Sequence, residues 1–123
     1  MALLERAEGP AAGSTTPPPP RVRFAVSRAV STAVVTLHGV LDDHGGELLA
    51  GVLRGVIDDV RTTVVVVDLR DVSRVELSTL EAFTAPSGWA RRKAVGFRLF
   101  GPPAALSDML TGAWLSGELD IVP

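Results

Sequence analysis

Hydroxyl and carboxylate side chains gather between residues 76 and 81, which read Glu-Leu-Ser-Thr-Leu-Glu. A serine followed three residues later by a glutamate forms a capping box, in which the hydroxyl accepts a backbone N–H bond and the glutamate reaches back. The spacing therefore predicts that Ser78 caps a helix and that Glu81 completes the box. Acyl-transfer chemistry at this serine would need a histidine beside it, and the chain has two histidines and no G-x-S-x-G elbow.

A second polar group comprises Asp42 and Asp43 with His38 and His44. These residue types bind metal ions, but one histidine falls in a predicted strand and the other in a predicted loop, residues 40–46. Such mixed polar loops are common without a metal, so we expect no metal site and read Asp42 or Asp43 as the cap of the helix that follows. With no cysteine in the chain, thiolate zinc and iron–sulfur sites are excluded. We predict no cofactor and no enzymatic activity.

The composition is that of one globular domain. The chain has 123 residues, of which 46% are hydrophobic and 21% charged, and its net charge is −2. The basic residues form no stripe, so no direct binding to nucleic acid is expected. The longest apolar strings, such as Val64–Val67, are too short to span a bilayer, and the first residues do not form a signal peptide. We expect a cytoplasmic protein without membrane contact.

Strands and helices alternate after a proline-rich start. Residues 1–20 end in Pro17–Pro20 and are predicted to be a disordered leader, with the domain over 21–123. Alternating apolar residues over 22–26 and 33–38 predict an antiparallel hairpin. Apolar residues every three or four positions predict a helix over 48–60. The β-branched run Val64–Leu69 predicts a central strand covered by helices on both faces.

The second half of the chain continues the alternation. After a loop at 70–77 we expect the helix that starts at Ser78, with a break or kink between Thr84 and Gly88 because of Pro86. A strand at 97–100, a helix over 104–111 and a short strand at 119–122 follow. Strands separated by helices run parallel. The predicted fold class is α/β, one mixed sheet with an N-terminal antiparallel hairpin and three to four packed helices.

Three stretches of this pattern resemble STAS domains, the fold of bacterial anti-sigma factor antagonists. Residues 37–42, Leu-His-Gly-Val-Leu-Asp, resemble the family's "L-x-G-x-L-D" turn into the first helix. Residues 64–72 resemble its "V-x-L-D-L-x-x-V" core strand. Residues 75–80, Val-Glu-Leu-Ser-Thr-Leu, stand where the family reads "x-D-S-S/T-G-L". The order and spacing of the stretches carry the resemblance, which covers residues 22–122.

The resemblance implies a protein-binding regulatory module without chemistry of its own. STAS domains of this type dock on an anti-sigma factor that is also a serine kinase and so control transcription. The kinase phosphorylates the first serine of "D-S-S/T-G", and the added charge ends the docking. Here Leu77 occupies that position, Glu76 replaces the aspartate and Thr79 replaces the glycine. The resemblance therefore implies a member whose switch is lost or moved, with Ser78 and Thr79 as the phosphorylation candidates.

The predicted docking surface follows from these matches. It comprises Asp42, Asp71, Val75, Glu76 and Leu77, together with Ser78 and Thr79, on loops beside the second long helix. Two readings of Leu77 stay open, an exposed apolar anchor for the partner or a side chain buried in the core. The alternative function is a structural STAS subunit of a stress-sensing or transporter complex. The apolar edge of the hairpin also leaves a homodimer open.

Overall fold

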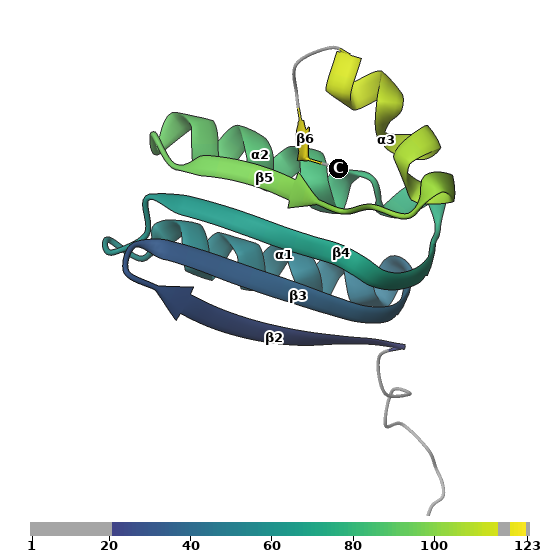
Figure 1. Cartoon of the computed structure of the whole chain (residues 1–123), viewed down its shortest axis with the longest axis horizontal. Coiled ribbons are helices and arrows are strands. Elements are labelled where there is room, and N and C mark those ends of the chain that lie inside the picture. The colour runs from purple at the N-terminus through teal and green to yellow at the C-terminus, as the bar shows by residue number, and fades with distance from the viewer. Residues whose placement is uncertain (1–20, 116–118, 123) are drawn as a thin grey trace, which may run out of the picture.

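A five-stranded mixed sheet organises the part of the chain that the computed structural model describes, residues 21–115 and 119–122 (Figure 1). The predicted leader, residues 1–20, lies outside the described residues. The elements follow in this order: β2 (Val22–Ala29), β3 (Thr32–Leu41), α1 (Asp43–Asp58), β4 (Val64–Val75), the 3-10 helix η1 (Leu77–Thr79), α2 (Glu81–Arg92), β5 (Gly96–Phe100), α3 (Ala104–Leu115) and β6 (Asp120–Val122).

The strands lie in the sheet in their chain order, β2-β3-β4-β5-β6. β2 and β3 pair antiparallel through a tight turn at Val30 and Ser31, which confirms the predicted hairpin. β3, β4, β5 and β6 all run parallel, because a helix separates each strand from the next. The predicted α/β class and mixed sheet are confirmed.

The valine run of β4 lies at the centre of the sheet, as predicted. Val65 and Val67 are fully buried, whereas Val64 and Val66 are only half-buried. Successive side chains of a strand point to opposite faces, and α1 and α2 lie side by side over the same face (Figure 1). The prediction that helices cover this run on both faces is therefore wrong, and one face of the valine run is partly open.

α1 begins earlier than expected. The side chain of Asp42 accepts a hydrogen bond from the Gly45 backbone N–H at 2.9 Å, so Asp42 is the cap, one of the two predicted candidates. The predicted loop at 40–46 is wrong, since β3 runs to Leu41 and both glycines lie in the first turn of α1. α1 also ends at Asp58, and Val60, expected in its apolar stripe, is 96% exposed.

Three other predicted boundaries are wrong. β4 continues to Val75 because residues 71–75 pair with β3, so no loop begins at Arg70. α2 runs unbroken through Pro86, a buried residue that removes one N–H donor from the helix and leaves the remaining bonds in place. α3 extends to Leu115, past the expected end at Thr111. The strand at the chain's end, β6, is confirmed.

Ion pairs tie the turns together at the end of the sheet where β4 begins. Asp59 accepts hydrogen bonds from Arg28 and Arg61, both at 2.8 Å, and the bonds from Arg61 hold the pKa of that carboxyl well below its usual range. The indole N–H of Trp89 lowers the pKa of Asp58. On β4, Arg70 lowers the pKa of Asp68.

Gly39 is predicted to be indispensable for the bend in β3. Its φ is +108°, and a Cβ there would lie 2.4 Å from the Arg21 carbonyl oxygen, so Gly39→Ala should lower the free energy of unfolding by about 1–3 kcal/mol. The matched control is Gly51→Ala in α1, where a Cβ meets nothing within 4 Å. That change should raise stability by up to about 1 kcal/mol. Urea unfolding measures both, and equal effects of the two substitutions would contradict this account.

The three lowered aspartate pKa values predict a loss of stability in acid. A carboxyl whose pKa is lower in the folded chain stabilises the fold above its unfolded pKa, about 3.9, and this contribution disappears as the pH falls through the folded value. The free energy of unfolding should be level from pH 7 to about pH 5 and fall below about pH 4. Asp59→Asn should flatten this fall, whereas Asp108→Asn, at an exposed site on α3, should not. Urea titrations at several pH values test this, and an unchanged acid profile in Asp59→Asn would contradict it.

Candidate docking surface

The carboxyl ends of β3 and β4 lie next to each other and bring two helix starts together. Leu41 and Val75 are partners in the parallel ladder, and the Glu76 backbone N–H donates to the Leu41 carbonyl at 3.0 Å. α1 follows directly after β3, and η1 follows directly after β4. The cap of α1, Asp42, therefore lies at the same edge of the sheet as η1.

Thr79 holds η1 in place through hydrogen bonds to Glu76 and a contact with α1. Its hydroxyl donates to the Glu76 carbonyl oxygen at 2.6 Å, and its backbone N–H donates to the same oxygen at 2.9 Å. The side chain is buried, and its methyl group lies so close to α1 that a Cβ on Gly46 would be 3.2 Å from it. Thr79 thus has a structural role, and its hydroxyl is not open to solvent as a phosphate acceptor would be.

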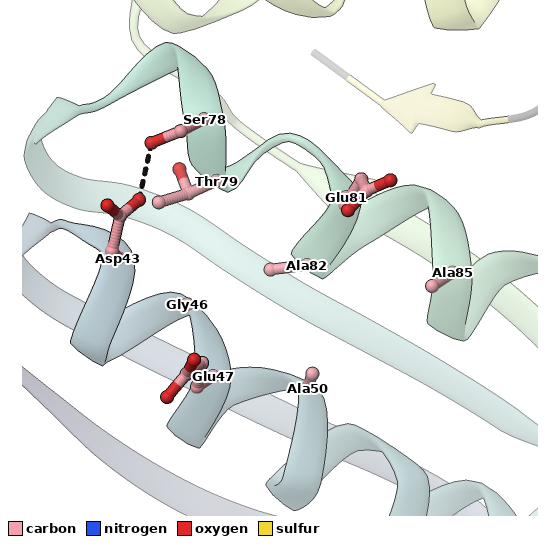
Figure 2. Close-up of a pocket in the computed structure, with 9 residues that line it drawn as sticks. All are labelled: Asp43, Gly46, Glu47, Ala50, Ser78, Thr79, Glu81, Ala82 and Ala85. Carbon is pink, nitrogen blue, oxygen red and sulfur yellow. Dashed lines mark hydrogen bonds between the residues drawn. The ribbon is translucent and has the colours of Figure 1, made fainter.

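Ser78 is exposed, and its hydroxyl donates to the Asp43 carboxylate in a short hydrogen bond (Figure 2). The predicted capping box is wrong. Leu80 precedes α2 in αR conformation, and no side chain caps that helix. The 3-10 turn runs almost directly into α2, so Ser78 is not in the extended conformation that a cap needs. Ser78 joins η1 to the start of α1 instead.

Leu77 is 69% exposed, so the reading that buries this side chain in the core is wrong, and its role as an anchor stays a prediction. It lies on the rim of η1, with Glu76 before it and the exposed Ser78 after it. An apolar side chain in this position contributes little to the core. It is available to a partner.

An acidic groove lies between the first halves of α1 and α2, with a volume of about 440 Å³. Asp43, Glu47 and Glu81 supply three carboxylates around it, and the side chains between the two helices are small (Figure 2). The lining residues are Asp43, Gly46, Glu47, Ala50, Ser78, Thr79, Glu81, Ala82 and Ala85. We call this feature the acidic groove.

Most of the predicted docking residues lie together at this edge of the sheet. Asp71 does not, because it belongs to β4 and its carboxylate pairs with His38 at 3.2 Å on the neighbouring strand. Its role in binding stays a prediction that its position does not favour. Glu47, and the position of Glu81 beside it, could not be predicted from the sequence, because the pairing of α1 with α2 has no local signal. The residues that gather are Asp42, Val75, Glu76, Leu77, Ser78 and Thr79.

Residues 21–115 and 119–122 contain no group of three or more His, Cys, Asp or Glu side chains placed to hold a metal ion. Within the same residues, no helix has the length and apolar character needed to cross a membrane.

Comparison with known proteins then places this geometry in a family. A family model described as "Mlab, STAS domain" matches residues 24–122, which is most of the chain. The chain belongs to the STAS domain family. The resemblance found in the sequence is confirmed. Comparison of this STAS domain with curated proteins finds no match.

Solved structures with the same fold are anti-sigma factor antagonists. One from Mycobacterium paratuberculosis is 19% identical with a TM-score of 0.72, and the match covers 83% of this chain and 86% of that one. Unphosphorylated SpoIIAA is 17% identical with a TM-score of 0.69, covering 82% and 89%. Phosphorylated SpoIIAA of Bacillus is 17% identical with a TM-score of 0.67, covering 82% and 92%. At these identities the likeness establishes the fold of this STAS domain.

Proposed function

We propose that this STAS domain is a regulatory protein-binding module that docks on an anti-sigma factor kinase, or a related regulatory protein, and thereby controls transcription in the cytoplasm. It has no catalytic activity of its own in this proposal. The docking surface comprises Asp42, Asp43, Glu76, Leu77 and Ser78. The observation that carries the proposal is the exposed Leu77, held on a fixed turn beside the acidic groove.

Physical reasons support Leu77 as the anchor of that surface. An apolar side chain that is desolvated at the centre of an interface contributes far more to binding than residues at the rim. The turn that carries it is held by the bonds of Thr79 to Glu76 and by the contact of Thr79 with α1. A surface that is already ordered loses little conformational entropy on binding. In this proposal the turn that carries Leu77 is already ordered in the free domain.

The charges around Leu77 indicate what the partner should look like. Asp43, Glu47 and Glu81 surround the adjoining groove, so the complementary face is expected to be basic with an apolar pocket for the leucine. Charge complementarity of this kind raises the association rate and excludes partners of the same sign.

The switch that the family uses is proposed to be absent at its usual position here. Leu77 stands where the resemblance places the acceptor serine, and Thr79 is buried. Ser78 is the one candidate of the two that is exposed. A phosphate on Ser78 would lie against Asp43, its present acceptor, so the new charge would meet a carboxylate at hydrogen-bond distance. Docking without phosphorylation is the arrangement that these contacts favour.

A structural role is the second candidate. A STAS domain that binds through an apolar residue at the acceptor position has what a permanent subunit of a stress-sensing or transporter complex requires, a contact that no kinase can end. The two candidates differ in lifetime. A regulatory partner should dissociate in vitro, and a structural partner should remain bound through purification.

Replacing Leu77 should weaken docking. Leu77→Ala removes most of the apolar anchor, so we expect the dissociation constant for the purified anti-sigma factor kinase of the same organism to rise at least tenfold. Val60→Ala is the matched control, because Val60 is 96% exposed at the opposite end of the sheet. Calorimetric titration measures both. Tight binding that neither substitution changes would place the docking surface elsewhere.

The kinase should not phosphorylate this chain. Incubation with the kinase and radiolabelled ATP should leave the parent protein unlabelled, because Leu77 has no hydroxyl and that of Thr79 is buried. A STAS protein with serine at the acceptor position, labelled in the same reaction, is the positive control. Robust labelling of the parent that Ser78→Ala abolishes would show that the switch has moved to Ser78.

A further inference from the structure

The acidic groove continues along α1 and α2 into a second hollow of about 200 Å³. Ala50 and Ala85 line both hollows, so the two form one groove with two ends. The second end is lined by two arginines and a tryptophan. Its residues are Ala50, Arg54, Ala85, Pro86, Trp89 and Arg92.

The second end of the groove is basic, because two guanidinium groups border it. The Arg54 guanidinium lies over the Trp89 ring, 4.0 Å from its centre, and that of Arg92 is 5.3 Å from the same ring. Neither arginine has a salt bridge or hydrogen bond to a described residue. The same holds for Glu47 and Glu81 at the acidic end. Three of these four charged groups therefore border the groove without an ionic partner among the described residues. The fourth, Arg54, interacts electrostatically with Asp58, one turn further along α1.

Helix dipoles explain only the charges on α2, where Glu81 lies in the first turn and Arg92 in the last. Acids near the start of a helix and bases near its end are stabilising, but the effect is confined to the first and last turns. Glu47 lies beyond the first turn of α1, and the last turn of α1 contains no basic residue, so Arg54 lies before it. The dipole of α1 therefore does not account for these two charges.

The acidic and basic groups lie on opposite sides of the two alanines. On α1, Glu47 comes three residues before Ala50 and Arg54 four residues after it. On η1 and the start of α2, Ser78 and Glu81 precede Ala85 by seven and four residues, and later on α2 Trp89 and Arg92 follow it by four and seven. A two-fold rotation about an axis through the middle of the groove therefore places the acidic half of one copy against the basic half of a second copy. A two-fold interface needs this self-complementarity.

We propose that the groove is the interface of a homodimer, in which a second copy of this chain lies antiparallel on the first. The two-fold axis passes near Ala50 and Ala85, in the plane of the interface and across the helices. Glu47 then faces Arg54 of the second copy. Glu81 faces Trp89 of the second copy, whose Arg92 lies about one turn further along the helix. The small side chains at the centre let the helices approach closely.

This dimer goes beyond the proposed docking function and would compete with it. The acidic half of the groove includes Asp43 and Ser78, which also belong to the docking surface, so a second copy covers part of the area that a regulatory partner needs. α1 and α2 have 16 and 12 residues and are therefore only about 24 and 18 Å long. An interface of that size lies toward the small end of stable contacts, so the dimer is reversible.

Sedimentation velocity on the purified chain tests the dimer. The parent should pass from monomer to dimer as its concentration rises, and more readily at low salt because the contacts are ionic. Glu47→Arg alone and Arg54→Glu alone should each raise the dimer dissociation constant about tenfold or more, since each puts like charges opposite one another twice per dimer. An equimolar mixture of the two single variants should dimerise again, because every contact then joins opposite charges.

The matched control is Arg23→Glu, which makes the same charge change on the outer strand β2 at an exposed site. It should leave dimerisation unchanged. A chain that stays monomeric at every concentration would overturn the proposal, and so would a dimer lost in Arg23→Glu but kept in Arg54→Glu, since that pattern would assign the contact to the β2 edge. Binding of the kinase is measured separately, so failure of the dimer leaves the docking proposal standing.

Discussion

The last hydrogen bond between β3 and β4 determines where the proposed docking surface lies. The hydrogen bond from the Glu76 N–H to the Leu41 carbonyl, 3.0 Å long, closes the parallel ladder at the point where both strands end. One residue later each chain segment turns into a helix, α1 at Asp43 and η1 at Leu77. Parallel strands always deliver their carboxyl ends to one edge of a sheet, and ligand sites of α/β folds gather there for the same reason. In this chain the edge presents an exposed leucine and an exposed serine beside the acidic groove.

Local patterns were sufficient to predict the architecture. The valine run of β4, the hairpin and the apolar stripe of α1 each depend on residues close in the sequence, and each forms the predicted element, although α1 begins earlier and ends before Val60. The end of β4 was predicted too early, because pairing with a neighbouring strand, and not residue type alone, decides how far a strand extends. Residues 71–75 include charged and hydroxyl side chains that favour a loop, yet the neighbouring β3 supplies partners for them.

The site was less predictable because its contacts are long-range. The Ser78 hydroxyl donates to Asp43, 35 residues earlier. The residues around Ser78 indicate only the local capping box and contain no signal for this distant partner. The family resemblance could align Leu77 with the acceptor position, but the exposure of its side chain depends on how η1 lies on the edge of the sheet. Likewise, Glu47 and Glu81 become neighbours only when α1 packs on α2.

The rigidity of this edge limits how docking is regulated. Gly46 leaves room for Thr79 and no more, since any larger side chain there would press on that methyl group. η1 therefore cannot move far unless α1 moves with it, and α1 is anchored in the core by fully buried Leu49 and Leu53. A loop fixed in this way is a poor conformational switch. In the proposed function, control therefore acts on the surface as it stands, by adding charge to it or by covering it. Because the resemblance places Leu77 at the acceptor position, covering is the means that fits this proposal, and the proposed dimer along the groove would provide it.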